Sequence, residues 1–504
     1  MKKSTWHKNH KWVGLPLCFF MLMFCLSGII LNHRSLVSQA NVSRGVLPPF
    51  YRFSGWNGGL LRGTLPLGNG NVLIYGAGGV WLTDSTAASI ADLNSGLPAG
   101  ADCRSIRSMA QTPGGEIFAV SAMGLYRLDG GTWSTMEIPA AHGERLSDIT
   151  THGDSLIVVG RSHLYIATAP YTRFTQLTIA TPSGHDGRST LFRSIWRLHS
   201  GELLGLPGRL VADALALTLI FLCLTGFAEW LLPKFRKRLG AKAKELIKWV
   251  FKWHNRMGRL TLPLTLLIVF TGWCLRPPLM IPLAMSKGKA PRAGQANAWS
   301  DKLRMLRYDD AAGDWVLSTS DGFFSLTSLD GIPVKIQQAP PVSVMGLNVW
   351  QRNAQGDWLC GSFSGMSVWN RTRGTVTDYF TGKSLLGKPG RPFTANAISG
   401  YSDDLACGPV AVLHDTGTDA IAQPKSLSKL PMSLWNVALE VHTGRIYFGN
   451  SATYFFVFIM GAAALWCIWS GFKLRKGKRK RRGRGFGRRR RRNDAVNDSN
   501  NSNK

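Results

Sequence analysis

KNHKWVGLPLCFFMLMFCLSG, residues 8–28, returns later in the chain as FKWHNRMGRLTLPLTLLIVFTG, residues 251–272. Each stretch has a histidine, a glycine four residues on, a long apolar run and a closing Ser/Thr-Gly pair. The histidine, His10 or His254, lies 18 residues before the glycine of that closing pair. The same residue types at the same spacing in two apolar runs indicate an internal duplication.

A second pair of stretches repeats in the same way. LHSGELLGLPGR begins at Leu198 and leads into a run that ends LTGF, while VHTGRIYFGNSA begins at Val441 and leads into a run that ends WSGF. The histidines, His199 and His442, lie 27 and 29 residues before the glycine of the closing pair. The repeating unit is therefore a span, an intervening segment and a second span, and it occurs twice.

Four apolar segments are long enough to cross a bilayer, whose core of about 30 Å takes about 20 residues of helix. These predicted spans are residues 12–32, 201–232, 259–282 and 446–472. The first has the basic start of a signal peptide, but no A-x-A-like cleavage site follows it, so we expect it to be retained. The fold class we predict is a membrane α-helical bundle of four spans with an internal duplication, plus an extracytoplasmic all-β, propeller-like domain.

The basic charge is concentrated beside these runs. Of a formal net charge of +31, residues 473–492 supply fourteen Lys/Arg and no acid, and residues 1–11 supply four Lys and no acid. Because cytoplasmic segments carry the excess of Lys and Arg, we predict a multi-pass protein of the bacterial inner membrane with both termini in the cytoplasm. The predicted cytoplasmic segments are residues 1–11, 233–258 and 473–504, and the predicted outer segments are residues 33–200 and 283–445.

The distribution of charge also bears on partners. A nucleic-acid-binding protein is expected to carry its basic charge on a folded domain, so nucleic acid is not an expected partner. The Arg-rich end of the chain is expected to bind acidic lipid headgroups, with an RNA-binding tail as the alternative.

The outer segments repeat internally. Five stretches share a Gly/polar turn, a short apolar run, a Gly or Ser break and a second short apolar run, which is the pattern of a β-hairpin. They begin at Gly70, Gly115, Gly153, Gly313 and Gly356. Steps of 45, 38 and 43 residues within each half match propeller-blade spacing. The sequence leaves two interpretations open: one propeller-like domain built from both halves, or two separate antiparallel β domains.

The four repeated histidines are candidate haem ligands. Haem b in a membrane bundle takes one imidazole from each of two facing helices. Duplication brings matched helices together, so we expect His10 to face His254, and His199 to face His442, with one haem near each membrane face. His33 is a rival outer ligand without a counterpart in the second half. The alternative is that interfacial histidines are only amphipathic anchors.

Asp213 is a further candidate functional residue, because a carboxylate inside a membrane span is costly and usually serves a function. It could carry a proton beside an electron path. Arg209 lies four residues earlier, so the alternative is an ion pair on one helical face near the interface.

The paired motifs NHKWVG…LSG, RLHSGELLG…LTG, WHNRMG…FTG and EVHTG…WSG resemble the PepSY-associated transmembrane helix family. That family includes bacterial inner-membrane proteins linked to iron uptake and ferric-siderophore reduction, some of which carry haem b. Matched by motif, the resemblance implies His10, His199, His254 and His442 as ligands of the haem iron. The outer segments show no clear PepSY-type α/β segment, so the resemblance covers the spans alone.

Two functions follow as expectations. The first is an inner-membrane haem b protein that moves electrons to an extracytoplasmic acceptor such as a ferric siderophore or another metal chelate. No nicotinamide or flavin motif is present, so a quinol or a partner protein would be the electron donor. The second is a membrane-anchored, propeller-like binding or sensory protein without redox activity. The sequence identifies no catalytic residue and leaves open whether the chain is itself an oxidoreductase.

Overall fold

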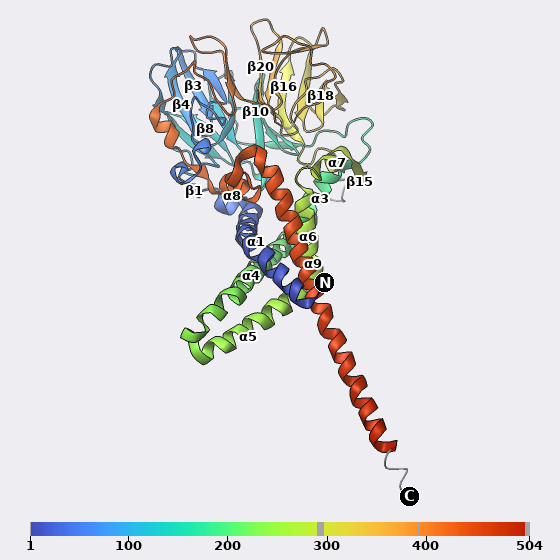
Figure 1. Ribbon diagram of the computed structural model, residues 1–504. Coiled ribbons are helices and arrows are strands. Elements are labelled where there is room, and N and C mark those ends of the chain that lie inside the picture. The colour runs from blue at the N-terminus through green and yellow to red at the C-terminus, as the bar shows by residue number, and fades with distance from the viewer. Residues whose placement is uncertain (1, 290–296, 392, 499–504) are drawn as a thin grey trace. The chain divides into compact units, whose positions relative to one another are not determined.

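The computed structural model describes residues 2–289, 297–391 and 393–498, which form two compact units (Figure 1). The helical unit comprises Met1–His33, Arg188–Pro291 and Ala438–Lys504, and the β unit comprises Arg34–Gly187 and Arg292–Val437. Each unit therefore takes chain from both repeats.

The helical unit is built around long apolar helices, in which α1 packs against α4 and α9, and α6 packs against α9 and α3. Trp273 on α6 donates a hydrogen bond from Nε1 to the carbonyl oxygen of Phe458 on α9 at 3.1 Å. The helices are α1 (Lys3–Asn32), α3 (Leu191–His199), α4 (Gly205–Leu231), α5 (Arg236–Leu260), α6 (Leu262–Cys274), α7 (Met280–Met285), α8 (Leu434–His442) and α9 (Arg445–Asp498). A short ladder joins β14 (Arg188–Thr190) to β15 (Lys287–Lys289).

Within the described residues, three helical segments are long and apolar enough to cross a membrane: Lys3–Asn32, Glu202–Phe235 and Ala452–Leu474. A fourth candidate is the pair Lys244–Leu260 and Leu262–Cys274, which is bent by 70°. The predicted span over 259–282 overlaps this bent pair, so the described residues hold four candidate spans if the pair counts as one. Pro263 stands in the first turn of α6, where its ring disfavours a helix that continues through it, and α6 ends shortly before Pro277 and Pro278.

The basic segment 233–258 lies between the second and third predicted spans. Most of it is helical, because α5 covers Arg236–Leu260. Lys and Arg are good helix formers, so a high positive charge does not by itself prevent a helix.

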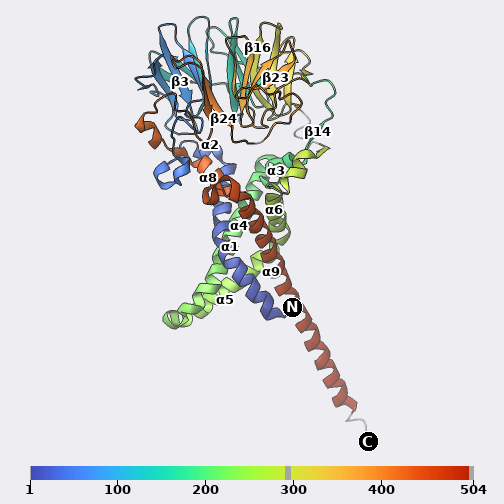
Figure 2. The same cartoon turned by 45° about the horizontal axis from the view of Figure 1, so that its top comes forward.

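The β unit consists of small antiparallel sheets, as predicted (Figure 2). Each of the five predicted stretches forms the hairpin of the two middle strands of a four-stranded sheet. The sheets are β2–β5 (Gly63–Pro66, Asn71–Gly76, Gly79–Asp84, Ala91–Asp92), β6–β9 (Ile106–Gln111, Ile117–Ser121, Leu125–Asp129, Thr132–Met136), β10–β13 (Leu146–His152, Ser155–Gly160, Leu164–Thr168, Thr175–Leu177), β16–β19 (Leu303–Asp309, Asp314–Thr319, Gly322–Leu326, Val334–Lys335) and β20–β23 (Leu347–Arg352, Trp358–Ser362, Gly365–Asn370, Thr375–Asp378).

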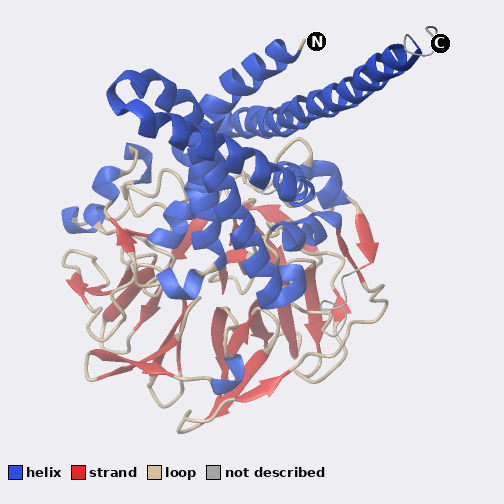
Figure 3. Cartoon of the chain, turned by 90° about the horizontal axis from the view of Figure 1, so that it is seen from below, coloured by secondary structure: helices blue, strands red, loops and turns tan. Residues whose placement is uncertain are grey.

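A sixth sheet pairs β24 (Ile398–Ser402) with β25 (Val410–Leu413), and a short ladder pairs β1 (Asn41–Val42) with β26 (Met432–Ser433). The four-residue helix α2 (Arg34–Val37) precedes β1. Figure 3, coloured by secondary structure, shows the strands grouped in several small sheets. Among the described strands, no hydrogen-bonded ladder joins the four-stranded sheets to one another, so they do not make a closed barrel.

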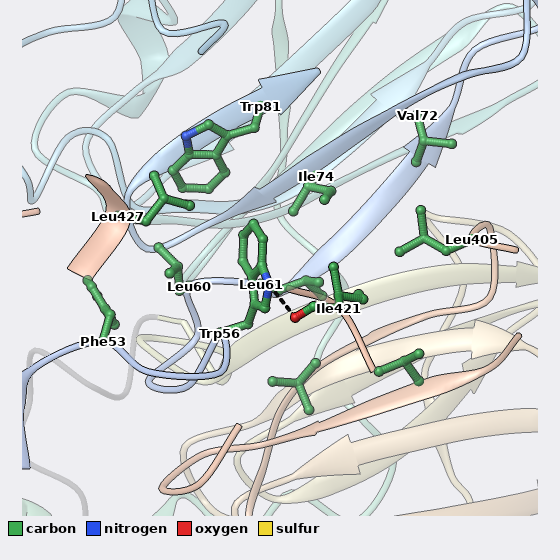
Figure 4. Packing of buried hydrophobic residues seen from close by; sticks show 12 residues of the cluster. Phe53, Trp56, Leu60, Leu61, Val72, Ile74, Trp81, Leu405, Ile421 and Leu427 are labelled. Carbon is green, nitrogen blue, oxygen red and sulfur yellow. Dashed lines mark hydrogen bonds between the residues drawn. The ribbon is translucent and has the colours of Figure 1, made fainter. Parts of the chain in front are cut away.

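The core of the β unit joins the two repeats. Trp56 and Trp81 from the first repeat are buried against Leu405, Ile421 and Leu427 from the second (Figure 4). The Nε1–H of Trp56 donates to the carbonyl oxygen of Ile421 at 3.2 Å. A buried tryptophan removes about 150–250 Å² from water, so this packing holds the outer segments of both repeats in one compact unit.

Candidate functional site

The helical unit places the four repeated histidines in two pairs. The ring centroids of His10 on α1 and His254 on α5 lie 6.4 Å apart, with an angle of 75° between the ring planes. The ring centroids of His199 on α3 and His442 on α8 lie 6.1 Å apart, with an angle of 48°. The pairing expected from the duplication is the pairing in the structure.

Each of the four rings is held at Nδ1 by a neighbouring helix. His10 Nδ1 lies 3.1 Å from the carbonyl oxygen of Cys467 and 2.9 Å from Ser470 Oγ on α9. His442 Nδ1 lies 2.9 Å from the carbonyl oxygen of Phe24 and 3.2 Å from Ser27 Oγ on α1.

The other two rings follow the same arrangement. His199 Nδ1 lies 3.0 Å from the carbonyl oxygen of Ile268 and 3.2 Å from Thr271 Oγ1 on α6. His254 Nδ1 lies 2.9 Å from Thr225 Oγ1 on α4. Each of these hydroxyls belongs to a Ser/Thr-Gly pair, and each lies in the repeat that does not contain its histidine.

These contacts determine the tautomer of each imidazole. A carbonyl oxygen can only accept, so Nδ1 carries the proton wherever it faces one. The hydroxyls donate their own protons to carbonyl oxygens of their own helices, as Thr225 Oγ1 does to Phe221 at 2.7 Å and Ser27 Oγ to Met23 at 2.6 Å. Their oxygens are therefore left to accept from Nδ1–H. Each ring keeps an unprotonated Nε2, which is the form that binds a metal ion.

The glycine of each Ser/Thr-Gly pair lets the ring approach the helix. A Cβ at these glycines would lie close to Cε1 of the imidazole that the adjacent hydroxyl holds. The distances are 3.3 Å at Gly28 to His442, 3.5 Å at Gly226 to His254, 2.8 Å at Gly272 to His199 and 3.4 Å at Gly471 to His10. The Ser/Thr-Gly pair is thus a seat for an imidazole: the hydroxyl receives Nδ1–H and the glycine leaves room for the ring.

Sequence reasoning used these four pairs only as spacing markers and missed their role as partners of the histidines. The glycines that closely follow the histidines have different surroundings from those of the Ser/Thr-Gly pairs. Gly201 and Gly444 adopt positive φ values of 77° and 79° just after α3 and α8, so they end these helices. A Cβ at Gly14 would lie 3.8 Å from Cys467 Sγ, and one at Gly258 would lie 3.7 Å from Leu222, so an alanine side chain would fit at both positions.

His33, the rival outer ligand, has a different partner. Its Nε2 lies 2.7 Å from Asp213 Oδ2, and Asn32 Nδ2 donates to Asp213 Oδ1 at 3.0 Å. Arg209 faces Glu202 at 3.5 Å. The ion pair between Arg209 and Asp213, offered as an alternative for this carboxylate, is therefore not formed. The carboxylate instead links α4 to the end of α1.

The β unit contains a separate hollow of about 460 Å³. It lies where β6, β10 and β16 end, and its lining includes His152, Arg307 and Tyr308. The rings of His152 and Tyr308 are 3.9 Å apart between centroids. This hollow could not be predicted from the amino-acid sequence, because its residues come from three different sheets.

Comparison with known families gives one match, to the family described as PepSY-associated TM region. It covers residues 1–232 and 164–478, which together include all the helices of the two histidine pairs. No curated protein matches the chain.

Solved structures give only distant similarities. The extracellular domain of a hybrid two component system from B. thetaiotaomicron is 10% identical, with a TM-score of 0.33, and the match covers 68% of this chain and 30% of that one. A protein of unknown function from Bacteroides caccae is 10% identical, with a TM-score of 0.28, over 72% of this chain and 96% of that one. PorZ of Porphyromonas gingivalis is 9% identical, with a TM-score of 0.22, over 70% and 44%. Scores this low carry no functional argument.

Proposed function

This chain belongs to the family of PepSY-associated transmembrane regions, and from that premise we propose that it is a bacterial inner-membrane haem b protein. In this proposal it moves electrons across the membrane to an extracytoplasmic acceptor, as a transmembrane oxidoreductase of the ferric reductase kind. The observation that supports it most is the pairing of four imidazoles, each fixed at Nδ1 by the opposite repeat.

The spacing within each pair would allow both imidazoles to hold one iron. Metal–imidazole nitrogen bonds of about 2.0 Å, with about 1.1 Å more to each ring centre, place two such centroids about 6.2 Å apart. The observed separations are 6.4 Å and 6.1 Å. A protein-bound zinc ion takes three or four side-chain ligands. In the part of the chain that the structure describes, no three His, Cys, Asp or Glu side chains gather to provide them.

The residues have distinct roles in this proposal. His10 and His254 would hold one haem, and His199 and His442 the other. Haem b supplies one-electron exchange at its iron when bound. The hydrogen bond at Nδ1 fixes the orientation of each ring and raises its basicity as a ligand, which the Ser/Thr hydroxyls and helix carbonyls provide here.

The two pairs stand at opposite ends of α1. His10 lies near its start, and Ser27, which holds His442, lies near its end. The 17 residues between them rise about 26 Å in a helix, close to the thickness of about 30 Å of a bilayer core. We therefore place the pair of His10 and His254 near the cytoplasmic face and the pair of His199 and His442 near the outer face, with both termini in the cytoplasm.

The β unit would receive the acceptor outside the membrane. We propose that its six sheets are the blades of a propeller, which is supported by the packing of β6 on β10, β10 on β16, β20 on β24, and β24 on β2. A ferric siderophore or another metal chelate would be the acceptor, and a quinol or a partner protein the donor. Membrane lipids would surround the helices and bind the basic tail.

Purification of the chain in mild detergent from haem-replete cells tests whether it binds haem. We expect a reduced-minus-oxidised spectrum with the α-band of haem b. His254→Ala and His442→Ala should each remove part of the haem, and together all of it. His7→Ala is the matched control, because His7 is exposed on α1 one turn before His10. A colourless preparation of the native chain would contradict the proposal that it is a haem b protein.

The alternative, a membrane-anchored binding or sensory protein, is favoured by the hollow in the β unit. It requires the β unit to bind its ligand without any redox step. Replacing all four paired histidines would then leave both the fold and ligand binding intact. Loss of a chromophore from His254→Ala alone would contradict this alternative.

A further inference from the structure

The first strands of five sheets in the β unit share a β-bulge near their start. In β6, the pairing with β7 skips from Ile106 to Ser108 and leaves Arg107 out of register. The corresponding skipped residues in β10, β16, β20 and β24 are Ser147, Arg304, Asn348 and Ser399. A bulge changes the direction of the side chain of its extra residue. Because the bulge recurs at one position, each of the five sheets has a redirected polar side chain there.

Four of these five side chains donate a hydrogen bond to a nearby carbonyl oxygen. The bonds run from Ser147 to Val159 at 3.0 Å, from Arg304 to Leu303 at 2.9 Å, from Asn348 to Ile398 at 2.7 Å and from Ser399 to Val412 at 3.3 Å. Arg107 is different: its guanidinium donates no hydrogen bond to any residue in the described part of the chain. A guanidinium has five N–H donors, so this leaves all of them available.

Arg62 stands at the matching place in the neighbouring sheet. Leu61-Arg62-Gly63 precedes and opens β2 as Ile106-Arg107-Ser108 opens β6, and β2 packs against β6. The main chain of Arg62 is paired, since its N–H donates to the carbonyl oxygen of Tyr75 at 2.8 Å. The guanidinium of Arg62, like that of Arg107, has no hydrogen-bonded partner among the described residues.

The surroundings of Arg107 are strongly positive. Burial lowers the pKa of Arg107 well below its ordinary value, and the charges of Arg62, Arg161, Arg34 and Arg145 lower it further. A cation placed among cations in this way is unfavourable without a counterion.

Three of those arginines already have carboxylate partners. Arg34 makes a two-pronged contact with Asp102, in which Nε lies 2.7 Å from Oδ2. Asp301 is shared by Arg145 and Arg161, each at 3.0 Å. Arg62 and Arg107 are thus the two guanidiniums of this group without a carboxylate partner among the described residues.

We propose that Arg62 and Arg107 form a binding site for a small anion that carries two or more carboxylate or phosphate groups. The planar fork of a guanidinium matches both groups, and two forks on adjacent sheets require more than one anionic group for simultaneous contact. This site lies within the β unit and does not depend on haem in the helical unit. An experiment can therefore contradict one of the two proposals without contradicting the other.

Calorimetric titration of the full chain in detergent tests the site, with citrate and inorganic phosphate as the probes. We expect saturable binding of at least one probe to the native chain. Arg62→Gln and Arg107→Gln should each weaken that binding by about tenfold or more, the loss expected for a charge-assisted hydrogen bond. Tighter binding of citrate would identify a polycarboxylate as the ligand, and tighter binding of phosphate a phosphorylated compound.

Arg373→Gln is the matched control, because Arg373 is exposed on the β unit and its loss changes the net charge equally. A second readout separates a ligand site from a structural role. Removing one cation from this group of cations should leave the melting temperature of the anion-free Arg107→Gln chain equal to or above that of the native chain. A lower melting temperature, undiminished binding in both variants, an equal loss in Arg373→Gln, or failure of the native chain to bind either probe would overturn the site.

Discussion

Replacing Gly272 by alanine is expected to displace the ring of His199, whereas replacing Gly226 by alanine is expected to leave His254 in place. A Cβ at Gly272 would come within 2.8 Å of His199 Cε1, but a Cβ at Gly226 would meet His254 Cε1 at 3.5 Å. Ordinary van der Waals contact begins at 3.4 Å, so the ring of His199 must move by about 0.6 Å while that of His254 need not move.

A shift of that size matters to a metal ligand, because metal–ligand distances are held to within about 0.2 Å. We therefore expect Gly272→Ala to lose the haem of the outer pair and to keep the other, while Gly226→Ala keeps both. Helix propensity favours alanine over glycine by about 0.5–1 kcal/mol, so the substitution should not unfold α6.

The assay is the haem content per chain together with the reduced-minus-oxidised spectrum, measured on purified protein with its melting temperature. Gly14→Ala is the control, because a Cβ there would lie 3.8 Å from Cys467 Sγ and has room. Full haem content in Gly272→Ala, or equal losses in Gly226→Ala and Gly272→Ala, would refute the idea that these glycines seat the imidazoles.

Replacing Ser470 by alanine removes one acceptor for His10 Nδ1–H, and the haem of that pair should dissociate more readily on dilution. The expected change in affinity is about 10–100-fold, as for other groups that support a metal ligand. Trp81→Ala should lower the free energy of unfolding of the β unit by about 3–5 kcal/mol, measured by denaturant titration of tryptophan fluorescence. Burial alone would raise the pKa of Asp309, but the hydrogen bond from Trp358 and nearby guanidinium groups bring it below its ordinary value of 3.8. The ionised carboxylate therefore stabilises the fold above pH 3.8 and loses this effect as the pH falls through the lower folded value. Asp309→Asn should lower the melting temperature at neutral pH, and its difference from the native chain should close below about pH 3.8.

The hairpins could be predicted because each has a turn glycine between two short apolar runs. Five of them, including those that begin at Gly115 and Gly356, are present as expected. The sheet of β24 and β25 was missed because its strands, Ile398–Ser402 and Val410–Leu413, are separated by a long connection without the repeated turn pattern.

The break in the predicted span 259–282 shows a limit of hydropathy. Average hydropathy counts apolar residues, but it does not register the backbone consequence of Pro263 in the first turn of α6. The apolar length was sufficient for a span, whereas the helix that forms is 13 residues long. Such a helix rises about 20 Å, so a fourth span requires α5 as well, across the 70° bend.

The histidine pairs could be predicted from symmetry alone, since duplicated helices that pack together bring equivalent positions together. Their hydroxyl partners could not, because each partner lies in the other repeat. The 18-residue spacing from His10 to Gly28 runs from the ring of one pair, near the start of α1, to the seat that receives His442 of the other pair, near the end of α1. The spacing between a histidine and the Ser/Thr-Gly pair of the same stretch therefore does not predict which imidazole that pair contacts.

Interdependence of the repeats leads to a last prediction. Each histidine pair takes one member from each repeat, and every histidine has its hydroxyl partner in the repeat that does not contain it. Residues 1–240 and 241–504, produced separately, should therefore each be colourless as monomers. Co-expression should restore haem to a complex of the two fragments, measured by absorbance across a sizing column. A monomer of either fragment that binds haem would show that a single repeat can build the site, contrary to the crossed contacts in the structure.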